Sequence, residues 1–416
     1  MIELRDYQLD ISKKTVNLLN TKKIAYLAME VRTGKTITAL YAAQIYGSRK
    51  VLFLTKLRAI TSIMSDYSAI NCTFEIKVIN NESMHKITDN DFDLLISDEH
   101  HRNSSFPKPN KGTKEIKQRF GHLPMIFLSG TPAIESGSQW YHSFWISNNS
   151  PFKYYTNFYK WAKDFVIPKI RFLGSIQVPD YSQSIDSKIL PIIEPYLFKY
   201  TQKEAGFTAE IDQHILYCKM NSITSFLIDK LLKDNVVVGN NDTILGDTAV
   251  KLMSKIHQVE NGTAIFESGN SAILDFSKAI FIREKFKGKK IAIFYYFQKE
   301  LEILKYIFGE NLCTDLETFD TTNKHIALQQ VSGSEGISLK VGDCLVYYNW
   351  GYSGKNFTQG RDRMTTIDRA DNNVYFVMIK GGINEKIYKS ISKKKRYNEK
   401  LFIKDYGIRK LNTIEN

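Results

Sequence analysis

The sequence predicts an α/β protein with two domains, each a mainly parallel sheet with helices on both faces. Its 416 residues are more than one hydrophobic core usually organises. Between residues 24 and 130, short apolar runs alternate with polar stretches of helical character, which is typical of a parallel sheet that is buried on both faces. The same alternation returns near residue 290, so we expect a second domain of the same class.

The apolar runs place the expected elements in order along the chain. In the first half we expect strands at 24–29, 50–55, 93–97 and 125–129, and helices at 36–47 and 57–68. In the second half we expect strands at 289–296, 325–331, 344–349 and 374–380, and a helix at 298–309.

Composition places the boundaries of the domains. We expect domain 1 at residues 1–210, a connector at 211–271 and domain 2 at 272–416. Residues 136–210 are rich in aromatic residues and Lys and carry few strand-like runs, which indicates a small helical insertion that protrudes from domain 1. In the connector, VVVGNNDTIL predicts a hairpin and DTAVKLMSKIHQ a helix. The basic tail after Lys380 is either a solvated helix face or a nucleic-acid contact.

Charge and cysteine content narrow the classes of partner and site. A net charge of +13 favours a polyanionic partner such as nucleic acid, although basic proteins without that role are common. The four cysteines are scattered without the spacing of zinc ligands or of a disulfide framework. The N-terminus lacks an apolar signal core and no apolar run approaches the length of a membrane span, so we expect a cytoplasmic protein without membrane contact, in the host cytoplasm if phage-encoded.

The segment MEVRTGKT, residues 29–36, is the first candidate site. A strand followed by Gly-Lys-Thr and a helix predicts a loop whose backbone N–H groups, with the helix N-terminus, bind phosphates. Lys35 then supplies a charge near the β and γ phosphates, and the hydroxyl of Thr36 binds Mg²⁺. An ordinary turn with a helix cap is the alternative for this segment alone.

Two further segments follow strands in the same half. SDEHH places Asp98 and Glu99 at the carboxyl end of a strand, where Asp98 is expected to hold Mg²⁺ and Glu99 to orient and deprotonate water. LSGTP places the hydroxyls of Ser129 and Thr131 after the next strand, and His101 is expected to couple the carboxylates to them. Each segment alone is an ordinary polar turn; their order after a phosphate loop favours a nucleoside triphosphatase.

The second half carries two segments with candidate residues. QVSGSEGISL, residues 330–339, has glycines that let the backbone approach a phosphate closely. NFTQGRDRM, residues 356–364, contains Arg361 and Arg363, which are candidates for fingers that stabilise charge on a transferred phosphoryl group. The alternative is an exposed, charged helix start.

Together these segments resemble a superfamily 2 helicase or translocase, with the Swi/Snf-like branch as the nearest pattern. LRDYQ resembles the adenine-recognising glutamine motif, and MEVRTGKT, LTKLRAI, SDEHHRN, LSGTP, FYYFQKELEIL, VSGSEGISL and TQGRDRM resemble motifs I, Ia, II, III, IV, V and VI. The resemblance implies two RecA-like domains with ATP in the cleft between them, and movement along DNA driven by hydrolysis.

The resemblance also implies roles for individual residues. It assigns ATP binding to Gln8, which reads the adenine, and to Arg5, Arg32, Thr33, Gly34, Lys35, Thr36 and Gly336. It assigns sequence-independent contacts with the nucleic-acid backbone to Thr55, Lys56, Ser332 and Gly333.

The sequence departs from the family pattern at three places. Met29 stands where motif I usually has its first glycine, and His100 where motif II has alanine. Arg361 and Arg363 are two residues apart rather than three, so the spacing does not decide which of them is the finger.

The sequence therefore predicts an ATP-dependent DNA translocase or helicase that uses ATP and Mg²⁺. As a minimal two-domain motor of a kind that a phage could encode, it is expected to rely on separate partners such as replication or recombination proteins. Two alternatives stay open: an RNA-dependent ATPase or RNA helicase, and a non-catalytic ATP-binding scaffold for replication proteins.

Overall fold

The computed structural model describes residues 3–133, 136–173, 176–206, 211–239, 242–333, 337–352, 354–364, 372–393 and 397–408. The chain divides into two compact units, Met1–Phe207 and Thr208–Asn416. Each unit is built around its own sheet, and in both sheets all pairings between the described strands are parallel.

Unit 1 has a six-stranded sheet within its described residues. Its strands, in spatial order, are β3 (Glu75–Asn80), β2 (Lys50–Thr55), β4 (Leu94–Ser97), β5 (Met125–Leu128), β1 (Ile24–Met29) and β8 (Leu197–Tyr200). Its helices are α1 (Asp6–Lys22), α2 (Lys35–Tyr46), α3 (Ile60–Ala69), α4 (Lys111–Phe120), α5 (Gln139–Trp145), α6 (Phe158–Phe165) and α7 (Asp186–Ile193).

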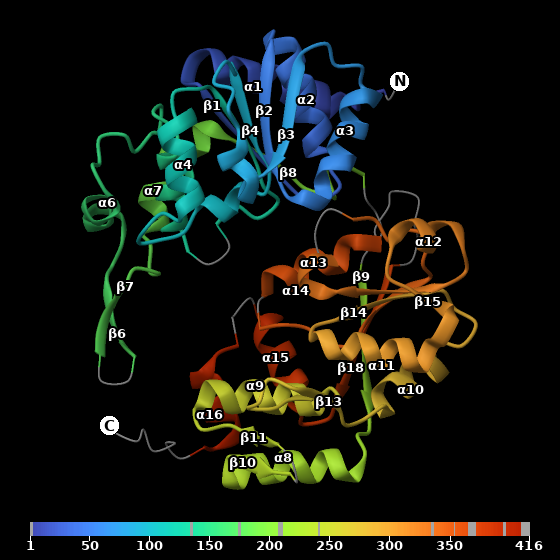
Figure 1. Ribbon diagram of the computed structural model, residues 1–416. Coiled ribbons are helices and arrows are strands. Elements are labelled where there is room, and N and C mark those ends of the chain that lie inside the picture. Colours follow the sequence, from blue (N-terminus) through green and yellow to red (C-terminus); the bar gives the residue numbers. More distant parts are fainter. Residues whose placement is uncertain are drawn as a thin grey trace. The chain divides into compact units, whose positions relative to one another are not determined.

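Helices cover both faces of this sheet (Figure 1). Alternate strand residues point to opposite faces, so Tyr26 and Leu52 pack with side chains of α4 and α5, whereas Leu27 and Phe53 pack with α1, α2 and α3. Because both faces are buried, the strands consist of almost continuous apolar runs, which is why the sequence predicted β1, β2, β4 and β5.

The region predicted as a helical insertion contains helices and also strands. Helices α5, α6 and α7 lie in residues 136–210, as does an antiparallel hairpin of β6 (Lys169–Leu173) and β7 (Ile176–Asp180). Strand β8 from the end of this region pairs with β1 in the main sheet. The insertion is therefore smaller than predicted, because β8 belongs to the domain itself.

Unit 2 has a second six-stranded sheet within its described residues. Its strands, in spatial order, are β15 (Leu312–Cys313), β16 (His325–Gln329), β14 (Ile291–Tyr295), β17 (Cys344–Tyr347), β18 (Asn372–Ile379) and β9 (Ile211–Cys218). Two hairpins, β10–β11 (Val236–Val238, Thr243–Leu245) and β12–β13 (Thr263–Ile265, Ser271–Ile273), lie outside it. The helices are α8 (Ser222–Asp234), α9 (Ala249–Glu260), α10 (Ser277–Lys285), α11 (Gln298–Phe308), α12 (Leu316–Thr321), α13 (Gln330–Gly333), α14 (Gly354–Arg361), α15 (Ile383–Ile391) and α16 (Glu399–Tyr406).

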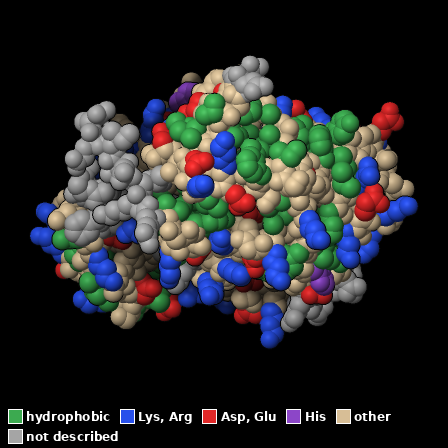
Figure 2. All heavy atoms as spheres, turned by 90° about the horizontal axis from the view of Figure 1, so that it is seen from below, with side chains coloured by type: hydrophobic (Ala, Val, Ile, Leu, Met, Phe, Trp, Pro, Cys, Tyr) green, Lys and Arg blue, Asp and Glu red, His purple; other side chains and the backbone are tan. Residues whose placement is uncertain are grey.

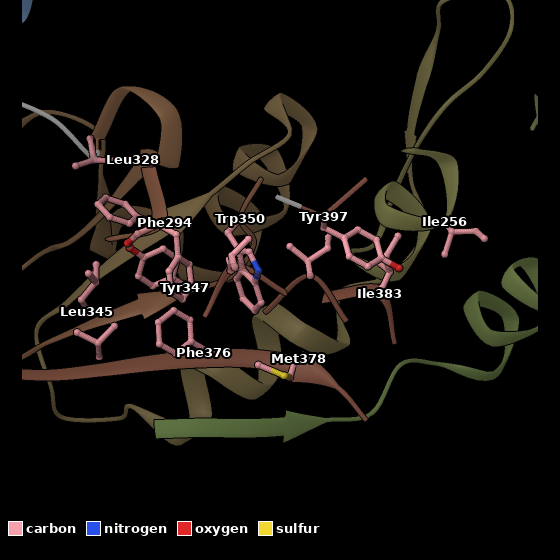
Figure 3. Close-up of a cluster of buried hydrophobic side chains, with 14 of the residues drawn as sticks. Ile256, Phe294, Leu328, Leu345, Tyr347, Trp350, Phe376, Met378, Ile383 and Tyr397 are labelled. Carbon is pink, nitrogen blue, oxygen red and sulfur yellow. The ribbon is translucent and has the colours of Figure 1, made fainter. Parts of the chain in front are cut away.

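The core of unit 2 lies on both faces of its sheet. On one face, Phe294, Tyr347 and Phe376 from three neighbouring strands pack together, with ring centroids of Tyr347 and Phe376 4.8 Å apart (Figure 3). Residues of α9, α15 and α16 complete this cluster, and residues of α10 and α11 cover the other face. The fold class is thus confirmed: two RecA-like domains, each a mainly parallel sheet with helices on both faces.

The segment 211–271, predicted as a connector, is instead an integral part of unit 2. Strand β9 pairs with β18 along its whole length, from Ile211 opposite Asn372 to Cys218 opposite Ile379. Helix α9 buries Leu252 and Ile256 in the unit 2 core. The predicted hairpin and helix do form, but they pack on this core rather than link two domains.

Candidate active site

The loop between β1 and α2 has the backbone of a tight turn. Arg32 and Gly34 have φ of 65° and 80°, the left-handed region that glycine adopts freely. The hydroxyl of Thr33 donates to the carbonyl of Glu30 at 2.8 Å and closes the turn. Gly34 is the N-cap of α2 and makes no side-chain hydrogen bond to it. The first backbone N–H groups of α2 therefore have no capping side chain, and such groups can bind an anion.

Distant segments hold this loop in place. The hydroxyl of Tyr7 donates to the carbonyl of Thr33 at 2.9 Å, and Nε2 of Gln8 lies 3.4 Å from the same oxygen. From beyond β8, Nε2 of Gln202 donates to the carbonyl of Val31 at 3.0 Å. Tyr7 and Gln202 were not among the predicted site residues, since their contacts with the loop span 26 and 171 positions and leave no local pattern in the sequence.

The glutamine near the N-terminus, predicted to read the adenine, lies beside the loop between β1 and α2. Gln8 is buried, and its Oε1 accepts from the backbone N–H of Arg5 at 3.0 Å. A Cβ on Gly34 would lie 2.1 Å from Nε2 of Gln8, so a larger residue there would displace the amide of Gln8. The guanidinium of the exposed Arg5 donates to the hydroxyl of Tyr7 at 3.3 Å.

Lys35 begins α2 next to the LSGTP segment. Its Nζ donates to the carbonyl of Glu30 at 3.0 Å and lies 3.7 Å from where a Cβ on Gly130 would stand. The two segments meet because β5, which leads into Gly130, is the direct neighbour of β1. Thr36 is half-buried in the first turn of α2.

Asp98 is a half-buried carboxylate directly after β4. Its Oδ2 accepts a hydrogen bond of 2.8 Å from the hydroxyl of Thr55, at the end of the neighbouring strand β2. Burial, with the adjacent Glu99 carboxylate, raises the pKa of Asp98 to about 6, while Thr55 and the ammonium of Lys35 act to lower it. The ammonium of Lys35 is thus near enough to act electrostatically on the Asp98 carboxyl.

A chain of polar contacts runs from Glu99 to the LSGTP segment. Nδ1 of His101 lies 3.3 Å from Oε2 of Glu99 and 2.9 Å from Oγ of Ser129. Oγ of Ser129 accepts from the backbone N–H of Thr131 at 3.1 Å. Within the described part of the chain, the buried hydroxyl of Thr131 has no hydrogen-bond partner. The structure thus brings the three residues predicted to couple the carboxylates to the next strand, His101, Ser129 and Thr131, next to Glu99.

His100 has a structural position. Its Nδ1 lies 3.0 Å from Oγ of Ser97 and its Nε2 2.8 Å from the carbonyl of Ser143, and its ring stacks on Phe127 with centroids 3.7 Å apart. Burial lowers the pKa of His100 to about 4, so the ring is neutral at pH 7 and Nε2–H donates to Ser143.

Thr55 does not occupy the position predicted for a nucleic-acid contact. It is fully buried and its hydroxyl is bonded to Asp98. We therefore correct its role: Thr55 orients the carboxylate. Lys56, the next residue, is half-buried at the start of a short 3-10 turn at Leu57–Ala59.

The two candidate arginines of unit 2 differ in exposure. Arg363 is 7% exposed, and its guanidinium lies 3.5 Å from the carbonyl of Ile337. Arg361, at the end of α14, is half-buried and lies 5.5 Å from the centre of the Phe357 ring. The preceding Gly360 packs so closely that a Cβ would lie 2.4 Å from the hydroxyl of Tyr347.

Two further predicted residues, Ser332 and Gly333, lie in α13. Gly333 is buried, and a Cβ there would lie 2.9 Å from both Phe294 and Leu328, so its backbone packs on the core of unit 2. Ser332 precedes it in the same short helix. Gly336 lies outside the described residues.

The described residues give little sign of a metal cluster, a membrane-spanning helix or a basic patch. Among the described residues, no cluster of three or more His, Cys, Asp or Glu side chains could hold a metal ion. None of the described helices has both the length and the apolar character that crossing a membrane requires. On the face shown in Figure 2, basic side chains are dispersed among apolar and acidic ones, so the charge of +13 does not by itself locate a site.

Comparisons with known proteins do not assign a family. No protein-family model matches the chain, and no curated protein matches it. Among solved structures, it is similar to the Hef helicase domain of Pyrococcus furiosus, with 14% identity and a TM-score of 0.47 over 93% of this chain and 98% of that one. A likeness of this degree carries no argument about function, so the function has to be inferred from the residues of the site.

Proposed function

We propose that this chain is an ATP-dependent DNA translocase or helicase. The observation that supports it most is the meeting of three segments at the carboxyl edge of the unit 1 sheet. Lys35 from the loop between β1 and α2 acts to lower the pKa of the half-buried Asp98, and Gly130 lies beside the Lys35 ammonium. Such edges are where open α/β sheets bind their ligands.

The residues fit a nucleoside triphosphate with Mg²⁺. The uncapped N-terminus of α2 and the Lys35 ammonium suit the phosphates. Mg²⁺ usually takes one or two protein oxygens and completes its shell with phosphate and water, so Asp98 and Thr36 are sufficient without a dedicated metal cluster. When bound, Mg²⁺ neutralises charge that develops on the phosphates.

The proposed chemistry assigns a task to each carboxylate. Asp98 acts as the metal ligand, held in orientation by Thr55. Glu99 orients the attacking water and accepts its proton, with Nδ1 of His101 3.3 Å from its Oε2. The contacts of His101 and Ser129 would transmit a change at Glu99 to the LSGTP segment.

Unit 2 is proposed to supply an arginine for the transferred phosphoryl group. Of the two candidates, Arg361 is the better one because Arg363 is almost fully buried and directed to the carbonyl of Ile337. Arg361→Ala should then reduce hydrolysis much more than Arg363→Lys, a variant that keeps the charge in the buried position.

The first test is ATP hydrolysis with single-stranded, double-stranded and forked DNA, with RNA and without nucleic acid. We expect DNA to stimulate phosphate release, and Lys35→Ala to abolish it. The matched control is Lys14→Ala, because Lys14 is an exposed lysine on α1. Stimulation by RNA alone would indicate an RNA helicase, and stoichiometric nucleotide binding without turnover would indicate a scaffold. No hydrolysis under any condition would overturn the proposal.

A second assay separates the two forms of movement. Strand displacement from a fork is measured beside displacement of a third strand from a triplex. Release of the triplex strand alone would mean translocation along an intact duplex, and release of the forked strand would mean unwinding.

A further inference from the structure

Two adjoining hollows lie on unit 1 away from the residues of the candidate active site. The first, about 400 Å³ in volume, is lined by polar and basic residues that include Lys117, Ser147, Asn148, Ser150 and Lys153. The second, about 140 Å³, is lined mainly by rings, among them Pro107, Pro109 and Tyr159. Trp145 and Thr156 line both hollows, so Trp145 forms part of the wall between them.

The first hollow suits a phosphate group. Lys117 is half-buried: its Nζ donates to Oδ1 of Asn148 at 3.3 Å and lies 4.9 Å from the centre of the Trp145 ring. Among the described residues, no acidic side chain lines this hollow, so none neutralises the charges of Lys117 and Lys153 from its walls.

Two hydroxyl groups, on the buried residues Ser147 (1% exposed) and Ser150 (2% exposed), lie in the wall of this positive hollow. The hydroxyl oxygens of Ser147 and Ser150 each accept a backbone N–H at 3.1 Å, from Asn149 and Phe152. Each hydroxyl proton then remains to be donated to another acceptor. Lysines with hydroxyl donors and no carboxylate form a set that recognises phosphate oxygens.

The second hollow suits a flat, weakly polar ring. Its walls carry two proline rings and the aromatic rings of Trp145, Phe158 and Tyr159. Tyr159 is 44% exposed, so its ring is accessible from solvent. Nucleic-acid bases stack on exposed aromatic rings without regard to base identity, since every base has a π face.

We propose that the two hollows together receive one nucleotide unit of a single-stranded nucleic acid, with its phosphate in the lysine hollow and its base in the aromatic hollow. An acidic peptide would be drawn to the lysines but would not need the neighbouring ring-lined hollow. The proposal rests on the proposed function only in taking a strand as the source of the nucleotide; the site is separate from the one proposed for ATP hydrolysis.

The test measures binding of a fluorescein-labelled dT20 oligonucleotide to the full chain by anisotropy, without ATP. We expect Lys153→Gln with Tyr159→Ala to weaken binding about tenfold. The slope of the logarithm of affinity against the logarithm of salt concentration should become shallower by roughly one. The matched control, Lys305→Gln with Tyr306→Ala, changes an exposed Lys and Tyr on α11 and should bind as wild type. Lys153→Gln alone, at an exposed position, gives a smaller loss of affinity without a risk to folding.

Further arms separate the ligands and the two proposed sites. Lys35→Ala should keep full affinity for the oligonucleotide, and the hollow variants should keep ATP hydrolysis measured without nucleic acid. Photocrosslinking of an oligonucleotide with 5-iodouracil should label Trp145 or Tyr159. Equal affinity of wild type and the hollow variant would overturn the inference. Competition by free thymidine monophosphate as strong as that by the oligonucleotide would overturn the strand as ligand, and equal competition by polyglutamate would overturn a nucleotide site.

Discussion

Thr55 and Asp98 are joined by a hydrogen bond of 2.8 Å from the hydroxyl of the threonine to Oδ2 of the carboxylate. The bond links the ends of two neighbouring parallel strands, since Leu54 of β2 lies opposite Ser97 of β4. The backbone N–H of Asp98 also donates to the carbonyl of Leu54 at 2.8 Å. The orientation of the proposed metal ligand is thus determined by the end of the adjacent strand.

Thr55→Val should lower the rate of ATP hydrolysis and raise the Mg²⁺ concentration needed for half-maximal rate. A hydrogen bond to a charged group contributes about 1.5–3 kcal/mol, which corresponds to a change of roughly 10- to 100-fold. Its loss also raises the pKa of Asp98, because the bond to Thr55 acts to lower it. Steady-state hydrolysis across a Mg²⁺ titration measures both effects.

Thr55→Ser is the matched control for this prediction, because it keeps the hydroxyl and removes only a methyl group. It should retain most of the activity and the Mg²⁺ dependence of the wild type. If Thr55→Val hydrolysed ATP like wild type at every Mg²⁺ concentration, the bond to Asp98 would have no part in the reaction.

Gly34→Ala should disrupt the phosphate loop. Its φ of 80° is unfavourable for alanine by about 1–2 kcal/mol, and the new Cβ would displace Nε2 of Gln8. We expect nucleotide affinity to fall at least tenfold, as measured with a fluorescent ATP analogue. Gly47→Ala at the other end of α2 introduces the same strain, at φ 79°, into open space. Gly47→Ala should lower stability slightly and leave nucleotide affinity unchanged. If both variants lost the same nucleotide affinity, the contact with Gln8 would have no part in nucleotide binding.

Burial decided which parts of the fold could be predicted. Strands such as β1 and β14 are buried on both faces and consist of apolar runs, which sequence patterns recognise readily. Strand β9 lies at the edge of its sheet and exposes Asp212 and Gln213, so its pattern resembles a polar linker. Residues 211–271 were therefore predicted as a connector, although pairing with β18 makes them part of the sheet.

In the candidate site, residues in short local segments could be predicted from the sequence, whereas their distant partners could not. Lys35, Asp98 and Ser129 were predicted because each directly follows a strand or begins a helix within a short, ordered segment. The partners that hold them are far away in sequence: Gln202 reaches the loop across 171 positions, and Thr55 reaches Asp98 across 43. The predicted nucleic-acid role of Thr55 failed because a residue type does not reveal which way its side chain points.

Acid should destabilise unit 1 through His100. Its pKa of about 4 in the folded chain lies below the ordinary value of 6.5, so the unfolded chain gains a proton first as the pH falls. Stability is therefore lost as pH falls from 6.5 toward 4, by at most about 1.4 kcal/mol per pH unit. His100→Gln removes this titration. The decrease in the free energy of unfolding that this substitution causes should therefore be about 2 kcal/mol smaller at pH 5 than at pH 7.5.

Urea unfolding followed by tryptophan fluorescence measures this effect, because Trp140, Trp145 and Trp161 all lie in unit 1. Tyr141→Phe is the control, since it alters the same aromatic cluster without removing a group that titrates in this range. Its cost should be equal at the two pH values. A cost of His100→Gln that does not change with pH would contradict a buried, neutral ring.

Glu260→Gln should loosen the N-terminus of α15 and destabilise unit 2. Both oxygens of the buried Glu260 carboxylate, at the end of α9, accept backbone N–H groups, from Ile383 at 2.6 Å and Asn384 at 3.0 Å. The glutamine amide cannot accept both bonds, and an unsatisfied buried group costs about 1–3 kcal/mol. Hydrogen exchange at those two amides should therefore become faster, and the free energy of unfolding of unit 2 should fall by that amount. Glu284→Gln, at an exposed carboxylate paired with Arg283, should have little effect. If hydrogen exchange at these two amides were unchanged in Glu260→Gln, α9 would not anchor α15. That result would also weaken the assignment of α9 to unit 2.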